Sequence, residues 1–199
     1  ALAGAAGASS SSTAAGGRDG DLPRRLAALV DQISTIVVGK RPQIEDCVAC
    51  LLAGGHLLIE DIPGVGKTTL AHALAVSLGL RFSRMQFTAD LMPSDLLGVS
   101  VFERSKEEFV FTIDGQTRAL PRPFFVIATQ NPSDQLGTYP LPESQLDRFL
   151  MCITLGYPDQ ASERALLAGE DRREAIAQLP TVMSPADLVA AQRAVLAVH

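Results

Sequence analysis

Apolar residues recur at helical spacing over two stretches near the start of the chain. The first predicts an amphipathic helix that begins at Pro23, has Asp21 as its cap, and closes within residues 36–39. The second predicts a helix that begins near Pro42 and stops at the glycine pair after residue 53. The compact apolar run that follows, residues 56–60, has the length of a buried strand.

Strand and helix patterns continue to alternate along the rest of the chain. Helical segments are predicted at residues 67–78, 91–98 (a turn and short helix), 143–148 and beyond Pro158, where a last helix begins at Ser184 and extends to His199. Strands are predicted at 81–87, 124–129 and 150–155, and hairpins at 99–111 and around Asp114-Gly115. This alternation predicts an α/β fold with helices on both faces of a parallel sheet and ligands at the carboxyl ends of its strands.

Composition narrows the classes of function. Residues 1–20 are almost entirely Ala, Gly and Ser, so we expect a disordered tail there. The 199 residues, 47% of them hydrophobic, suffice for one good core or for a core with a small satellite domain. A net charge of -5 and an aromatic content of 5% without Trp argue against nucleic acid or an anionic membrane as the main partner.

The sequence shows neither a membrane-spanning segment nor a secretion signal, and its cysteines also bear on the cellular location. No apolar run approaches the roughly 18 residues of a membrane-spanning helix, and no basic segment precedes an apolar core at the start. Three cysteines are poor material for a disulfide framework and typical of a reducing compartment. Cys47 and Cys50 have the spacing of a metal or redox pair, but without a second pair we expect buried small hydrophobes. We therefore expect a cytoplasmic protein.

The strongest chemical signal is the sequence Asp-Ile-Pro-Gly-Val-Gly-Lys-Thr-Thr at residues 61–69, between a predicted strand and a helix. Small residues let backbone N–H groups close around phosphate oxygens, and the helix N-terminus adds its positive dipole. Lys67 can reach the outer phosphates and Thr68 can ligate magnesium. The alternative is a glycine-rich turn, and Asp61 replaces the first glycine of the general pattern. The predicted phosphate-binding residues are Pro63, Gly64, Val65, Gly66, Lys67, Thr68 and Thr69.

Five segments together resemble the MoxR family of AAA+ ATPases: residues 37–40, 55–68, 86–95, 127–132 and 137–149. The resemblance covers residues 22–199. It implies a P-loop NTPase fold, with residues 21–156 as the nucleotide-binding domain and 157–199 as a truncated helical lid. It also implies ATP and Mg2+ as cofactors, a homo-oligomeric ring with a hexamer as its expected form, and chaperone-like remodelling or maturation of a client protein that the sequence does not name.

The resemblance assigns roles to residues outside the loop. Asn131 matches the family's sensor asparagine, which can hold the attacking water; the alternative is a turn residue before Pro132. Arg148 matches an arginine that reaches the neighbouring subunit's nucleotide, where it can be worth about 10³ to 10⁵ in rate; the alternative is a pair with Asp147 or a helix C-terminus. Val38 and Gly39 would lie against the adenine. The expected catalytic residues are Lys67, Asn131 and Arg148.

One expected element is absent from the sequence. Hydrolysis by a P-loop enzyme needs a strand that ends in Asp, for magnesium, followed by Glu as the base. In the family this strand lies between segments that match Phe111 and Thr112, and it would pair between the strands at 81–87 and 124–129. Either it is deleted and the protein is inactive, or roughly thirty residues are omitted from the numbering, which is the interpretation we favour. The expected function is ATP hydrolysis at subunit interfaces; the alternatives are nucleotide binding without hydrolysis and, third, action on DNA.

Overall fold

The computed structural model describes residues 2–4, 21–84, 99–103, 108–113, 116–119, 122–131, 143–158, 160, 163–164 and 172–197. Its helices are α1 (Leu22–Ile36), α2 (Arg41–Leu52), α3 (Lys67–Ser77), α5 (Glu143–Leu146), α7 (Arg172–Ala177) and α8 (Pro185–Leu196). Its strands are β1 (Leu2–Gly4), β2 (Leu57–Glu60), β3 (Phe82–Ser83), β4 (Val99–Glu103), β5 (Glu108–Ile113), β6 (Gln116–Ala119), β7 (Phe124–Gln130) and β8 (Met151–Ile153). The turn and short helix predicted at 91–98 lie outside the described residues.

Three parallel strands form the centre of the fold. The main sheet has the order β3–β1–β7–β2–β8, and β2 is parallel to both of its neighbours, with Leu57 opposite Ile127 on one side and Met151 on the other. Leu57, Leu58 and Ile59 are all buried, as in a strand that is covered on both faces. This confirms the predicted parallel α/β fold.

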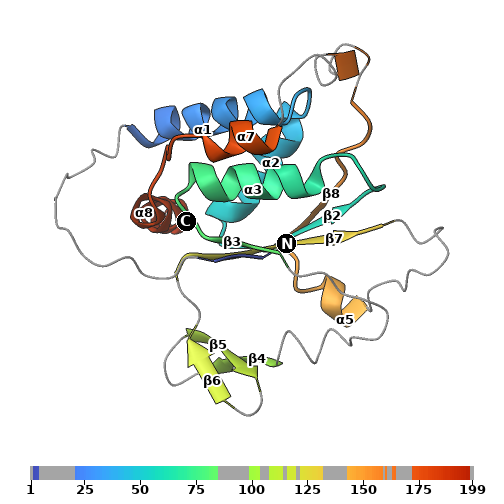
Figure 1. Cartoon of the computed structure of the whole chain (residues 1–199). Coiled ribbons are helices and arrows are strands. Elements are labelled where there is room, and N and C mark those ends of the chain that lie inside the picture. Colours follow the sequence, from blue (N-terminus) through green and yellow to red (C-terminus); the bar gives the residue numbers. More distant parts are fainter. Residues whose placement is uncertain are drawn as a thin grey trace.

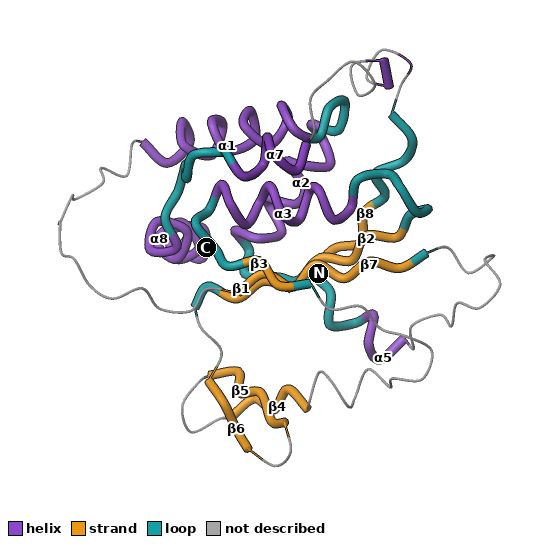
Figure 2. Tube along the Cα trace, in the orientation of Figure 1, coloured by secondary structure: helices purple, strands orange, loops and turns teal. Residues whose placement is uncertain are grey.

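The larger helices gather on one side of this sheet. In Figures 1 and 2, α1, α2, α3 and α7 lie on one side, and the short α5 lies on the other. Leu57 and Ile59 of β2 belong to the same buried cluster as Ile33, Ile44 and Leu70 of the helices. The core therefore lies between α1, α2, α3 and the sheet.

The C-terminal helices belong to this same core. Ile176 of α7 and Leu188 of α8 are buried with the main cluster. Gln192 of α8 donates a 2.7 Å hydrogen bond to the Leu51 carbonyl at the end of α2. α8 begins at Ser184-Pro185 as predicted, and Ser184 caps it, with its hydroxyl accepting from the Asp187 N–H at 3.2 Å. Asp21, by contrast, makes no side-chain bond at the start of α1, because its backbone is already in the helical region (φ -98, ψ -13), so the predicted cap is wrong.

The two predicted hairpins form a small sheet of β4, β5 and β6. Val99 lies opposite Thr112, and Ser100 lies opposite Phe111. Phe111 and Thr112 are therefore consecutive residues of the same strand, β5. Whether the acidic strand is deleted or omitted between them stays a prediction.

The first strand of the chain differs most from expectation. We predicted a tail without structure over residues 1–20, yet Leu2–Gly4 pairs with both β3 and β7, antiparallel to each. Backbone pairing does not require large side chains, and strands on both sides offer N–H and C=O groups that would otherwise lack partners. β1 therefore occupies the position, between β3 and β7, at which the acidic strand was expected.

Candidate functional site

The segment from Asp61 to Gly66 forms a loop that connects β2 to α3. Gly64 and Gly66 have φ of +91° and +94°, a region that favours glycine, while an added Cβ at either position would meet nothing within 4 Å. The backbone conformation, rather than lack of space, therefore requires these glycines. Pro63 and Gly64 are exposed and Val65 is half-buried, so the loop borders solvent.

Lys67 is the first residue of α3, and its side chain folds back over the loop. Its Nζ donates hydrogen bonds to the carbonyl oxygens of Asp61 and, at 2.8 Å, of Ile62. Burial lowers the pKa of Lys67, and the negative charge of Asp61 partly opposes this change. The ammonium group thus already lies at the mouth of the loop, next to the exposed Thr68 and the half-buried Thr69.

Asp61 joins several parts of the site. It is buried, and its carboxylate accepts the backbone N–H of Ile62 at 2.8 Å and that of Gly156, beyond β8, at 2.6 Å. Its own N–H donates to the Gln130 carbonyl at the end of β7 at 3.0 Å. From the sequence, Asp61 was predicted only to depart from the phosphate-loop pattern. That departure, an acid where glycine is usual, was the available signal.

Asn131 follows β7 directly. Because Glu60 pairs with Gln130 and the Asp61 N–H bonds the Gln130 carbonyl, the backbone of Asn131 lies beside the start of the loop. Its side chain is half-buried. The site thus brings the predicted sensor residue and the loop to the same end of adjacent parallel strands.

Arg148 lies in a turn after α5, with an exposed side chain. No ion pair joins it to Asp147 or to any other residue that the structure describes. The alternative of a pair with Asp147 is therefore not supported.

The segment before α2 contributes Val38, Gly39 and Lys40. Val38 is half-buried and Gly39 exposed, with φ of +74°. Lys40, by contrast, is buried and donates a 2.8 Å hydrogen bond to the Tyr157 carbonyl. Sequence reasoning missed Lys40, although a charge that ends an apolar run was a visible signal.

Within the loop, Thr68 is the residue that best suits Mg2+. The Thr68 hydroxyl is a hard oxygen ligand of the kind that Mg2+ takes together with phosphate oxygens, and its exposure at the loop fits that role. Among the described residues, no group of three or more His, Cys, Asp or Glu side chains could hold a metal ion.

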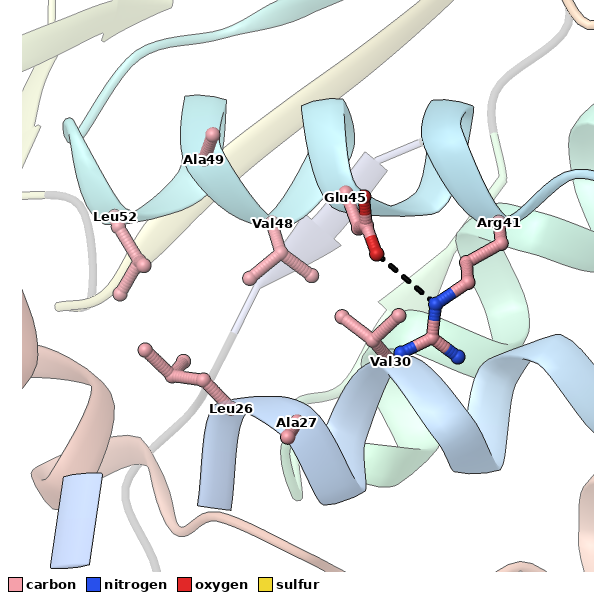
Figure 3. A pocket seen from close by; sticks show the side chains of 8 residues that line it. All are labelled: Leu26, Ala27, Val30, Arg41, Glu45, Val48, Ala49 and Leu52. Carbon is pink, nitrogen blue, oxygen red and sulfur yellow. Dashed lines mark hydrogen bonds and ion pairs between the residues drawn. The ribbon is translucent and has the colours of Figure 1, made fainter. Parts of the chain in front are cut away.

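A hollow elsewhere on the surface does not belong to this site. The groove between α1 and α2 has a volume of about 290 Å³ and is lined by Leu26, Val30 and Val48 among others, with Arg41 bonded to Glu45 at one end (Figure 3). It includes no residue of the loop, and its apolar walls would not hold phosphates.

The cysteines carry no second site among the described residues. Cys47 and Cys50 are free and fully buried, as predicted, and burial raises the pKa of Cys47 to about 12.

No helix in the described part of the chain is both long and apolar enough to cross a bilayer.

A glycine-bearing loop between a parallel strand and a helix, with a lysine and threonines at the helix start, defines a P-loop nucleotide-binding protein. The model of the ATPase family associated with various cellular activities (AAA) matches residues 56–113 and 107–151. The crystal structure of a candidate ATPase from Cytophaga hutchinsonii is similar, with a TM-score of 0.67 and 31% identity over 85% of this chain and 62% of that one.

Curated relatives identify the family. The chain is 40% identical to the uncharacterized protein YeaC of Bacillus subtilis, over 88% of this chain and 66% of the relative. It is 34% identical to the chaperone MoxR1 of Mycobacterium tuberculosis, over 71% and 47%, and 30% identical to the protein MoxR of Methylorubrum extorquens, over 71% and 52%. The chain belongs to the MoxR family of AAA+ ATPases. It spans less than two thirds of the length of these relatives.

The alignments with the relatives contain more positions than the number of residues of this chain that they include. The YeaC alignment runs over 210 positions but uses 88% of the 199 residues, about 175, so about 35 positions have no counterpart here. The MoxR1 alignment runs over 177 positions and uses 71%, about 141 residues, which leaves about 36. The two ranges of the family match meet at residues 107–113, within and next to β5.

Proposed function

We propose that this chain binds ATP with Mg2+ at residues 63–69 and acts, in a homo-oligomeric ring, as a chaperone-like ATPase that remodels or matures partner proteins. The observation that supports nucleotide binding is the position of the Lys67 ammonium, which donates to the Asp61 and Ile62 carbonyl oxygens beside the loop that is proposed to bind phosphate. The chaperone role rests on the MoxR1 relative. The hexamer remains the expected form of the ring.

Each proposed site residue has a chemical task. Backbone N–H groups of the loop and the start of α3 bind phosphate oxygens, and Lys67 moves from the Asp61 and Ile62 carbonyls to the outer phosphates. Thr68 would hold Mg2+, which supplies charge neutralisation when bound. Val38 and Gly39 are proposed to lie against the adenine.

Two further residues serve hydrolysis in this proposal. Asn131 orients the attacking water with a neutral amide. Arg148 reaches the nucleotide of the neighbouring subunit, which its exposure and lack of an ion pair in the described structure support. An arginine supplied in trans stabilises the charge that develops during phosphoryl transfer.

A second candidate is nucleotide binding without hydrolysis. It is favoured by β1, which fills the position between β3 and β7 with the sequence Leu-Ala-Gly, a strand that contains no acid. Without a carboxylate there, neither the magnesium contact through water nor the catalytic base is provided from that strand.

The test separates binding from hydrolysis. ATP affinity is measured by titration calorimetry, and phosphate release is measured in parallel, for the unmodified chain, Lys67→Ala, Arg148→Ala and the exposed control Arg193→Ala. Lys67→Ala should lose binding, whereas Arg148→Ala should bind ATP normally and release phosphate at least about 10³-fold more slowly. Equal behaviour of all four proteins would contradict the proposed site.

A mixing experiment tests the action of Arg148 across subunits. Lys67→Ala subunits provide a normal Arg148, and Arg148→Ala subunits provide a normal loop, so their mixture should release more phosphate than either alone. Binding without any phosphate release in the unmodified chain would instead establish the second candidate.

A further inference from the structure

Two charged side chains are buried in the described part of this protein, and both hold the same turn. Lys40 is 9% exposed and Asp61 is 5% exposed, and no other charged residue that the structure describes is as deeply buried. Lys40 Nζ donates to the Tyr157 carbonyl at 2.8 Å, and Asp61 Oδ2 accepts from the Gly156 N–H at 2.6 Å. Opposite charges from two distant segments thus bind consecutive residues just beyond β8.

These contacts are not a simple ion pair. The described structure has no salt bridge between Lys40 and Asp61; each side chain bonds the backbone of the turn. Burial of a charge is strongly unfavourable unless hydrogen bonds compensate for the lost water. Both buried charges therefore stabilise one specific backbone conformation, in which Gly156 has φ of +67°.

Asp61 also connects this turn to the phosphate loop. Its carbonyl oxygen is one of the two that hold the Lys67 ammonium, while its carboxylate holds Gly156. If Lys67 turns towards a phosphate, Asp61 loses a charge-assisted bond at one end and keeps the Gly156 bond at the other. Any change in the backbone at Asp61 is then passed on through a 2.6 Å contact.

We propose that Lys40 and Asp61 are positioning residues that clamp the Gly156–Tyr157 turn and transmit occupancy of the phosphate loop to the chain beyond β8. Lys40 fixes Tyr157 to the start of α2. A displacement of Asp61 therefore moves Gly156 relative to Tyr157 and changes the conformation of the turn, instead of shifting the whole turn. The inference rests on the proposed nucleotide binding and adds the route by which binding is passed on.

The chain offers a clean reporter for this movement. It contains no Trp, and Tyr157 is 77% exposed, so Tyr157→Trp introduces a single fluorophore at the turn without disturbing the core. ATP binding is measured separately by titration calorimetry. Saturating ATP with Mg2+ should shift the Trp emission of this variant, and Lys67→Ala added to it should abolish both binding and the shift.

The decisive variants remove one side of the clamp at a time. Asp61→Asn keeps the shape of the side chain but can accept only one of the two N–H groups, and Lys40→Met removes the donor with little change in volume. Each should still bind ATP at saturation and should lose most of the emission shift. Glu60→Gln and Arg41→Met, the corresponding losses of charge at exposed neighbouring positions, should retain the shift.

The outcomes separate the two proposals. The clamp would be overturned by a full emission shift in both Asp61→Asn and Lys40→Met with ATP bound. It would also be overturned if ATP binding to the protein with an intact clamp changed neither the emission nor the Gly156 amide exchange. Thermal unfolding of each variant identifies simple loss of the fold, and if one variant fails to fold, the other still decides. Absence of ATP binding in the unmodified chain would refute the proposed function, and the clamp with it.

Discussion

Arg25 of α1 and Asp187 of α8 form an ion pair in which Nη2 and Oδ2 lie 2.6 Å apart. The same carboxylate accepts from the Ser184 N–H at 2.9 Å and from the Ser184 hydroxyl at 2.6 Å, so it completes the cap of α8. The hydrogen bond from Arg25, and then that from Ser184, lower the pKa of Asp187 well below its ordinary value of 3.8. One side chain therefore joins the first and last described helices.

Asp187→Asn should lower the free energy of unfolding by about 1 kcal/mol at neutral pH, since the pair is a third exposed and screened by solvent. Because the folded-state pKa is lowered, this stabilisation is complete above 3.8 and decreases as pH falls towards the folded-state value. Urea unfolding between pH 7 and pH 3 should show the difference between the two proteins shrinking at the acid end.

Asp31→Asn is the matched control, because Asp31 bonds Arg41 in a pair whose side chains are more than half exposed. It should leave unfolding nearly unchanged at every pH. A constant difference between unmodified chain and Asp187→Asn down to pH 3 would contradict the assignment.

Ala3→Pro tests β1. Ala3 lies opposite Phe82 of β3 and Phe125 of β7, and proline removes the N–H that a central strand must donate. Loss of this pairing should raise amide exchange in β3 and the first half of β7 and destabilise the fold by about 1 kcal/mol or more. Ala14→Pro, outside the strand, should have no such effect; equal exchange in both variants would mean that β1 does not protect its neighbours.

Gly55→Ala tests the approach of the α5–β8 connection to β2. A Cβ at residue 55 would overlap the Cβ of Leu150, which cannot move without the backbone that also carries Arg148. The substitution should cost about 1–3 kcal/mol of stability. Gly54→Ala meets no atom and should cost only the strain of its φ of +69°, about 1 kcal/mol. The larger loss is expected at residue 55 in thermal or urea unfolding.

Thiol labelling tests the burial of the cysteines. Cys152 is exposed, whereas Cys47 and Cys50 are buried. The pKa of the Cys152 thiol is raised, first by the partial loss of water around it and then by the negative charge of Glu60. The native chain should label at Cys152 alone, slowly at neutral pH and faster in Glu60→Gln, and at all three positions in denaturant. Rapid labelling of three thiols in the native protein would contradict the packing of α2.

Periodicity predicted most of the elements, because α1, α2, α3, β2 and β7 each have an apolar pattern that matches their burial. β1 could not be predicted in this way. Leu-Ala-Gly carries no strand signal, and it forms a strand because β3 and β7 leave backbone groups to pair. Asp21 failed as a cap for a similar reason: its backbone conformation, which the sequence does not reveal, prevents the side chain from reaching the helix.

The loop itself was predictable because each of its residues has a local chemical reason to be there. The contacts of Lys40 and Asp61 were not, since their partners, Tyr157 and Gly156, lie far along the chain and offer only backbone atoms. A hydrogen bond to a backbone atom leaves no trace in the identity of the partner residue. The family roles of Asn131 and Arg148 remain predictions that the kinetic experiments test.

Pairing of Leu2 with Val126 also bears on the order of folding. Residues 2–4 are synthesised before either neighbouring strand, yet their full pairing needs both β3 and β7. Contacts between such distant residues form late and slowly, because a long loop must close first. A segment that is made before both of its neighbours is thus paired only after they have formed, and until then the edges of β3 and β7 that face it lack partners.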